Sequence, residues 1–406
     1  MERETIFYLS KRIINPYKFI KMAQNFHPVV QKLVDLIRTN NWQSKFEEAL
    51  KKCDAENVEG FEDIKTLDDY FKWCDAQLSW IPVENNYGTL VYDHIAKFYF
   101  LLDQSPVKEL QNPVVPHDKM QPLTPLSEWM REYVDALGAW MDEPGSISQQ
   151  SVETFMNAPR YNMGEYVCPR GGWKTFNQMF ARHTKPGYRP IAAIDDPCVL
   201  TSPADSTFDG QWEVNTNSHV NIKGLDWRIE ELLEGSPYAN EFMGGIWTHS
   251  FLNTTDYHRQ HTPIMGKVLE SREIQGCVYL QVSAEPIPGD PNGKKRVVMK
   301  RTFDIPDTPG YQFQQTRGLV VLDSPIGLVA VLPMGMAQVS SIIMTAEVGR
   351  TLHKGEEISY FQFGGSDIVT VYQQQSNVSL TACPGVHYKV GTRIGMAYPV
   401  IPPRRY

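Results

Sequence analysis

The spacing of hydrophobic residues changes near residue 150, and this change limits the folds that the chain can adopt. Before it, apolar residues recur at helical spacing over residues 29–37 and again over residues 126–141. The second helix has a clear start, because Thr124 can cap it and Pro125 needs no backbone donor in the first turn. A polar, turn-rich stretch follows. We therefore expect an α+β chain whose residues 1–150 form a helical N-terminal domain.

From residue 151 on, apolar residues alternate with a period of two, which is typical of strands. We expect the second domain, residues 151–406, to be β-rich. Residues 285–296 contain too many Pro and Gly residues for a regular element and are expected to form an exposed loop. Two of the expected strands flank a short connection and predict a hairpin. The candidate strands are 220–222, 277–282, 319–322, 328–332 and 368–372.

One stretch, residues 324–346, carries no charge and has enough residues for a transmembrane helix. Pro325, Gly327, Pro333 and Gly335 interrupt it, so two buried strands are the better interpretation. We expect no stable insertion into a membrane.

The charge balance disfavours a role in nucleic-acid binding. The chain has 39 Lys and Arg residues against 47 Asp and Glu residues, a net charge of −8, whereas a phosphate-binding surface carries positive charge. The six cysteines form no CxxC pair and favour reduced thiols over a zinc knuckle or a disulfide framework. The amino terminus has charges where a signal peptide would be apolar, so we expect a cytoplasmic protein.

The densest chemical pattern is Asp256-Tyr-His-Arg-Gln-His-Thr-Pro263, in which His258 and His261 are three residues apart. A metal site would need a third ligand and, usually, a helix that brings both rings to one side. Pro263 predicts a loop or a strand end instead, so we expect no metal here. Structural packing of one of the two histidines is the alternative.

A second pattern is Gly364-Gly365-Ser366, which precedes the expected strand 368–372 and is expected to form a turn. The glycines permit unusual backbone conformations and leave the Gly365 carbonyl carbon open to close approach. A serine hydroxyl can attack the carbonyl that precedes it when a base takes its proton. An ordinary turn that enters a strand is the alternative, and the pattern is not a GxSxG elbow.

A third residue, Asp205, lies in the tight turn Ser202-Pro-Ala-Asp205. Most turn aspartates only bind backbone N–H groups. Together with the histidine pair and Ser366, however, Asp205 completes a set that can supply an orienting group, a base and a nucleophile.

These segments together resemble the phosphatidylserine decarboxylase family, whose members cut themselves at a Gly–Ser bond and convert the serine into a pyruvoyl group. The resemblance spans about residues 170–406 and rests on four motifs in the right order. They are residues 180–190, Pro203-Ala-Asp205, residues 256–263 and residues 355–366.

The helical first part, the segment Phe251-Leu-Asn253 and the double glycine resemble the soluble branch of the family, which includes the L-tryptophan decarboxylase of psilocybin biosynthesis. This resemblance implies a free L-amino acid as substrate, aromatic in kind, such as L-tryptophan decarboxylated to tryptamine. A soluble phosphatidylserine decarboxylase that makes phosphatidylethanolamine is one alternative. An unprocessed, non-enzymatic scaffold or binding protein is another, and a hydrolase acting on external substrates is a third.

The resemblance also implies a role for each residue of the set. Asp205 would orient His261, and His261 would take the proton from Ser366. Ser366 would then attack the Gly365 carbonyl, so that the chain is cut between residues 365 and 366 into a large and a small chain that stay associated. Ser366 would become the covalent pyruvoyl cofactor, which replaces pyridoxal phosphate (PLP). His258 would return a proton to the α carbon of the substrate.

The roles of two further residues, Asp367 and His249, stay open. Asp367 stands directly after Ser366, where the family commonly has serine or threonine. Its carboxylate could hinder the ester formed during cleavage or could bind the ammonium group of a substrate. His249, upstream of the histidine pair, fits either a place in the pocket or a place in the core.

Overall fold

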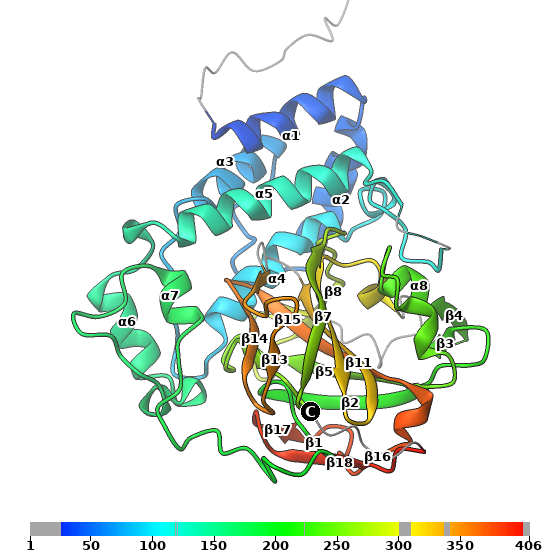
Figure 1. Cartoon of the computed structure of the whole chain (residues 1–406). Helices are drawn as coiled ribbons and strands as arrows, with labels where there is room; N and C mark the ends of the chain where they lie inside the picture. Colours follow the sequence, from blue (N-terminus) through cyan, green and yellow to red (C-terminus); the bar gives the residue numbers. More distant parts are fainter. Residues whose placement is uncertain are drawn as a thin grey trace, which may run out of the picture.

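The computed structural model describes residues 26–117, 119, 121–222, 224–299, 310–336 and 342–400. Helices α1 to α5 gather at one end of the molecule and the strands at the other, which confirms the α+β class (Figure 1). The helices of the described residues are α1 (Pro28–Thr39), α2 (Gln43–Ala55), α3 (Leu67–Gln77), α4 (Leu90–Leu102), α5 (Pro125–Met141), α6 (Gln149–Met156), α7 (Phe176–Phe180) and α8 (Ile229–Leu232).

The strands follow in two halves of the sequence. The first half has β1 (Val199–Thr201), β2 (Ser206–Glu213), β3 (His219–Ile222), β4 (Leu225–Arg228), β5 (Ile246–Leu252), β6 (Arg259–His261), β7 (Gly266–Ile274), β8 (Val282–Pro286) and β9 (Lys295–Met299). The second half has β10 (Arg317–Ser324), β11 (Gly327–Met336), β12 (Ile342–Met344), β13 (Thr351–Leu352), β14 (Glu357–Phe361), β15 (Gly365–Tyr372), β16 (Val378–Leu380), β17 (His387–Tyr388) and β18 (Arg393–Ala397).

The two helices with the clearest periodicity form as predicted. Thr124 accepts a hydrogen bond from the N–H of Ser127 at 3.3 Å, and Pro125 occupies the first position of α5. The indole N–H of Trp129 on α5 donates to the carbonyl of Val29 on α1 at 2.8 Å, which joins the two helices inside the core.

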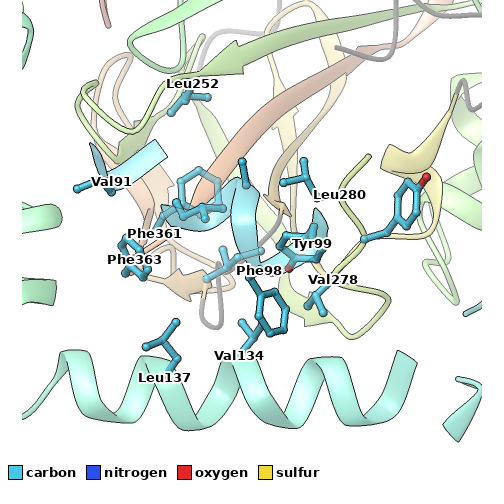
Figure 2. Packing of buried hydrophobic residues seen from close by; sticks show 14 of the residues in the cluster. Val91, Phe98, Tyr99, Val134, Leu137, Leu252, Val278, Leu280, Phe361 and Phe363 are labelled. Atoms are coloured by element: carbon cyan, nitrogen blue, oxygen red, sulfur yellow. The ribbon is translucent and has the colours of Figure 1, made fainter. Parts of the chain in front are cut away.

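The helical region packs directly on the β-rich region. Helix α4 is buried along most of its length, and Figure 2 shows its Phe98 and Tyr99 above Val134 of α5, with Phe361 of β14 to the left. All four side chains belong to one hydrophobic cluster. Helical structure also continues past residue 150, since Ser148 caps α6. The domain boundary at residue 150 stays a prediction.

The principal sheet has eight strands in the order β13-β7-β10-β11-β15-β5-β2-β17, and its neighbouring strands run antiparallel. Strands β10 and β11 form the predicted hairpin, closed where Ser324 pairs with Gly327. The uncharged stretch 324–346 therefore contains strands, although residues 337–341 lie outside the described residues. No helix among the described residues is both long and apolar enough to cross a membrane.

The two faces of this sheet belong to different cores, because successive side chains of a strand point to opposite faces. On β10, Val320 and Leu322 join the cluster shared with the helices, whereas Leu319 and Val321 join a second cluster. The same alternation on β15 places Ile368 in the first cluster and Val369 in the second. Ser366 therefore shares a face with Ile368.

The structure corrects the predictions for two segments in part. Residues 285–296 are not a loop throughout, because β8 and β9 form a hairpin that extends into them at both ends. Residues 277–282 do not form a strand before Val282, although they are mostly buried. The side chain of Gln315 takes the place of a neighbouring strand there: its amide oxygen accepts the N–H of Tyr279 at 3.0 Å, and its amide nitrogen donates to the carbonyl of Tyr279.

Candidate functional site

The Gly365–Ser366 bond lies in a strand rather than in the predicted turn. Strand β15 begins at Gly365, which pairs with Met336 of β11, and Ser366 lies opposite Gly335 on one side and Leu252 of β5 on the other. The change of direction occurs one residue earlier, at Gly364, whose φ of +145° favours glycine. Pairing with two neighbouring strands thus outweighs the turn preference of the Gly-Gly-Ser sequence.

The hydroxyl of Ser366 is buried in the principal sheet. The residue has no exposed surface, and its Oγ has no hydrogen-bond partner among the described residues. The turn that contains Asp205 lies against the same face of β15, because Pro203 and Ser206 line a small gap together with Ile368. The fold therefore brings the predicted nucleophile and the predicted aspartate to one region, between the principal sheet and the turn after β1.

Asp205 is bound by an arginine and not by a histidine. Nε and Nη2 of Arg189 donate to the two carboxylate oxygens of Asp205 at 2.5–3.0 Å, and both side chains are almost fully buried. The N–H of Val390 donates to Oδ1 of Asp205 at 2.8 Å, and Arg189 also pairs with Glu165 at 2.7 Å. Asp205 was predicted to orient His261, but no hydrogen bond joins the two side chains among the described residues.

His261 has a defined tautomer. The backbone N–H of His261 donates to the carbonyl of Pro203 at 2.8 Å, so the backbone of His261 lies beside the Asp205 turn. Its Nδ1 is 2.8 Å from the carbonyl oxygen of Gly355, and its Nε2 is 3.1 Å from the hydroxyl of Tyr257. Since a carbonyl only accepts, Nδ1 carries the proton of the neutral ring and Nε2 accepts from Tyr257. Burial lowers the pKa of His261, and the hydrogen bond to Gly355 and the charges of Glu357 and Asp205 offset part of this effect.

His258 lies deeper than His261. Its ring is fully buried and stacks on Phe180 at 3.9 Å between ring centroids. The ring of Phe180 in turn packs against the ring of Phe363, with 5.8 Å between the ring centroids, and Phe363 lies three residues before Ser366. No described side chain is hydrogen-bonded to either ring nitrogen of His258. Burial, with a contribution from the charge of Arg182, lowers the pKa of His258 well below its usual range, so the ring is neutral.

The loop that carries His258 is held by a buried arginine to which the sequence alone gave no role. Arg182 donates to the carbonyls of Thr255 and Asp256 at 3.0 and 3.2 Å, and its guanidinium lies 4.1 Å from the centre of the Tyr166 ring. Arg182 and Arg189 both belong to the 180–190 motif. This motif also contains apolar residues. Two arginines in such a motif could have indicated that their side chains are buried and hold neighbouring segments in place.

Asp367 points away from the Ser366 hydroxyl. As the next residue of β15 it faces the opposite side of the sheet, where the hydroxyl of Tyr311 donates to its Oδ2 at 2.5 Å. Nε2 of His249 lies 3.1 Å from the same oxygen. His249 is thus a core residue, and the carboxylate of Asp367 already has partners on its own face.

A cleft of about 610 Å³ opens next to the histidine loop. It lies between the start of α4, the end of β5 and strand β9, and residues 253–256, which lead into His258, form one of its walls. Its lining is mostly polar or charged and includes Asp93, Arg160, Asp256, Arg296 and His387 beside the aromatic ring of Phe251.

Comparison with known proteins identifies the family. The sequence profile described as phosphatidylserine decarboxylase matches residues 176–396, which is more than half of the chain. The chain belongs to the phosphatidylserine decarboxylase family. The match covers α7, the principal sheet and all four predicted site residues, and the members of this family are carboxy-lyases.

Individual relatives in the phosphatidylserine decarboxylase family differ in length. The chain is 32% identical over 237 residues to phosphatidylserine decarboxylase proenzyme 3 of Schizosaccharomyces pombe, covering 58% of this chain and 22% of that protein. It is 31% identical over 257 residues to proenzyme 2 of Oryza sativa subsp. japonica, covering 62% and 38%. It is 29% identical over 255 residues to decarboxylase iboD of Amanita muscaria, covering 58% and 71%. The chain thus spans well under half the length of the first two relatives.

Proposed function

We propose that the chain cuts itself between Gly365 and Ser366 and then decarboxylates a free aromatic L-amino acid, with L-tryptophan as the first candidate. The observation that carries the proposal is the position of Ser366. Its hydroxyl is buried with no partner among the described residues at the start of a central strand, two residues after Gly364, a glycine with positive φ. A buried polar atom without a partner is costly and marks a place where chemistry or strain is built in.

Self-cleavage needs a base for the Ser366 proton, and His261 has the right protonation state. In its neutral ring Nδ1–H is held by the carbonyl of Gly355, and Nε2 is the basic atom, whose lone pair accepts the Tyr257 hydroxyl in this structure and would have to exchange that partner for Ser366. Asp205 acts on this ring through its charge, and Arg189 fixes the carboxylate in place. The serine oxygen attacks the Gly365 carbonyl, so the peptide bond becomes an ester and the amine of residue 366 becomes free. Elimination then breaks the ester C–O bond, which leaves a carboxylate on Gly365 of the large chain and a dehydroalanine at residue 366. Water converts the dehydroalanine into a pyruvoyl group and ammonia, and residues 366–406 become the small chain.

The residues around Ser366 fit a pyruvoyl group, because the only polar atom of that side chain has no competing partner among the described residues. Such a group supplies a ketone that accepts the electron pair released as carbon dioxide leaves. We assign the return of a proton to the α carbon to His258. Since its buried ring is neutral in the substrate-free chain, His258 takes up the proton it delivers within the reaction cycle.

The cleft beside the histidine loop supports an amino acid as the substrate. Acidic side chains (Asp93 and Asp256) and basic ones (Arg160 and Arg296) together suit a small molecule that carries both an ammonium and a carboxylate. The ring of Phe251 adds an aromatic surface. Phosphatidylserine is the second candidate, favoured by the names of the relatives from Schizosaccharomyces pombe and Oryza sativa.

The test begins with the freshly purified full chain beside Ser366→Ala, by denaturing electrophoresis and intact mass. We expect two chains from the wild type, with a small chain that begins with a pyruvoyl group and stays bound to the large chain in gel filtration. We expect one chain from Ser366→Ala. An uncut wild type that retains an unmodified serine contradicts the proposal and favours the scaffold alternative.

The substrate is then identified by carbon dioxide release from L-tryptophan, L-phenylalanine, L-tyrosine, L-serine and phosphatidylserine vesicles, each with the wild type and with Ser366→Ala. Release from an aromatic amino acid with the wild type alone supports the proposal. Release from phosphatidylserine alone replaces it with the second candidate.

A further inference from the structure

A buried charged cluster lies behind the cleavage site, on the face of the principal sheet opposite to the Ser366 hydroxyl. Asp367 has no exposed surface, and its Oδ2 accepts the hydroxyl of Tyr311 at 2.5 Å and lies 3.1 Å from Nε2 of His249. The other ring nitrogen of His249, Nδ1, lies 2.8 Å from Oδ2 of Asp209. The histidine is therefore held between two aspartates.

The charge state of this histidine follows from its neighbours. Burial alone would lower the pKa of His249, but the charges of Asp367 and Asp209 and hydrogen bonding to both outweigh it and raise the pKa to about 9. The ring of Trp247 stacks on the ring of His249, with 5.9 Å between the ring centroids. At neutral pH, His249 is thus a buried cation whose ion pair with Asp367 is protected from solvent.

The members of the cluster fall on two sides of the proposed cut. Asp209 on β2, His249 on β5 and Tyr311 all precede Gly365 and belong to the large chain. Asp367 alone follows the cut, as the second residue of the small chain. The ion pair and the tyrosine hydrogen bond therefore join the two chains at the point where the backbone would be interrupted.

We propose that Asp367 is a positioning residue that anchors the new end of the small chain to the large chain after cleavage. A free end of a strand tends to fray, because its first residue has lost the covalent neighbour that held it. Residue 366 is that first residue, and in the cleaved chain it would carry the electrophile. A neighbour fixed by a buried ion pair keeps it paired with Gly335 and Leu252. This inference rests on the proposed self-cleavage.

Hydrogen exchange measured on peptides from residues 366–372 tests the anchor without any substrate. Four full-length proteins are compared: wild type, Asp367→Asn, Ser366→Ala and the double variant. In the cleaved background we expect Asp367→Asn to speed exchange at the start of β15 by about tenfold, with β10 unchanged. In the uncut Ser366→Ala background the backbone still holds residue 366, so the same substitution should change exchange by less than about threefold. Asp226→Asn, on the exposed side of β4, is the matched control and should change nothing.

An equal acceleration in cut and uncut chains would overturn the proposal, because the cluster would then stabilise the fold in general. No acceleration in either background would overturn it as well. If Asp367→Asn does not fold, Tyr311→Phe replaces it, since it removes only the hydroxyl hydrogen bond, and the same contrast between cut and uncut chains is expected at about threefold. If the wild type is never cut, the proposed function fails before the anchor is tested, and the intact mass reveals which of the two has failed.

Discussion

Arg189→Met gives the sharpest test of how the site is held together. The side chains of Arg189 and Asp205 are only 6% and 4% exposed, so the substitution leaves a buried carboxylate without its cation. Glu165, the second partner of Arg189, keeps Lys389 at 2.7 Å. Removal of one member of a buried ion pair costs about 3–5 kcal/mol. Because the N–H of Val390 still donates to Asp205, we expect the lower end, about 3 kcal/mol of unfolding free energy.

The measurement is urea unfolding at pH 7 in the uncut Ser366→Ala chain, where a single polypeptide unfolds, with linear extrapolation to water. Arg189→Met combined with Asp205→Asn removes the stranded charge as well and should recover most of the loss. Arg38→Met, which breaks an exposed pair with Asp35, should cost less than about 1 kcal/mol. A loss below about 1 kcal/mol for Arg189→Met, or no recovery in the double variant, would refute the ion-pair reasoning.

Three further predictions concern the histidines. His261→Ala should remain uncut like Ser366→Ala, and denaturing electrophoresis that showed two chains from it would contradict its role as the base. His258→Ala should be cut normally but lose decarboxylation by about a hundredfold or more, whereas an uncut His258→Ala chain together with a normally cut His261→Ala chain would mean that the two histidines exchange roles. The pKa of His249 is raised from its usual 6.5 to about 9, so its contribution to stability is fully present below pH 6.5 and is lost as the pH rises through 9. The free energy of unfolding of the uncut chain should fall by up to about 3 kcal/mol as the pH rises from 6.5 through 9. His249→Gln should remove this dependence on pH. A His249→Gln chain with the full pH dependence would point to another group.

The parts of the fold that follow local rules could be predicted from the sequence. Residues 126–141 form a helix because their apolar side chains repeat with the helical period and Thr124 caps the start. The β10–β11 hairpin follows from two apolar runs around a short turn. The four candidate site residues were named from their types and order, and their roles came from the family resemblance. The structure places the turn that contains Asp205 against β15 and the backbone of His261 beside that turn.

Features that depend on distant partners could not be predicted. Gly-Gly-Ser has a turn preference, but pairing with β11 and β5 extends the strand to Gly365. Residues 277–282 look like a strand, yet the side chain of Gln315 occupies the place where a partner strand would bind. Asp205 is bound by Arg189 rather than by a histidine, and no spacing rule connects those two positions. Such contacts arise only when the tertiary structure places both groups together.

Strand β15 lies inside the principal sheet, between β11 and β5, and the segments after it contribute β17 to the same sheet and β16 and β18 to another. Cleavage as proposed would convert a single folded chain into a complex of two polypeptides whose strands alternate in the same sheet. The uncut chain refolds at a rate that does not depend on its concentration, whereas the denatured, processed protein must reassemble by encounter of two molecules. Each processed molecule would therefore keep its activity only as long as it avoids complete unfolding, and its lifetime becomes a kinetic property rather than an equilibrium one.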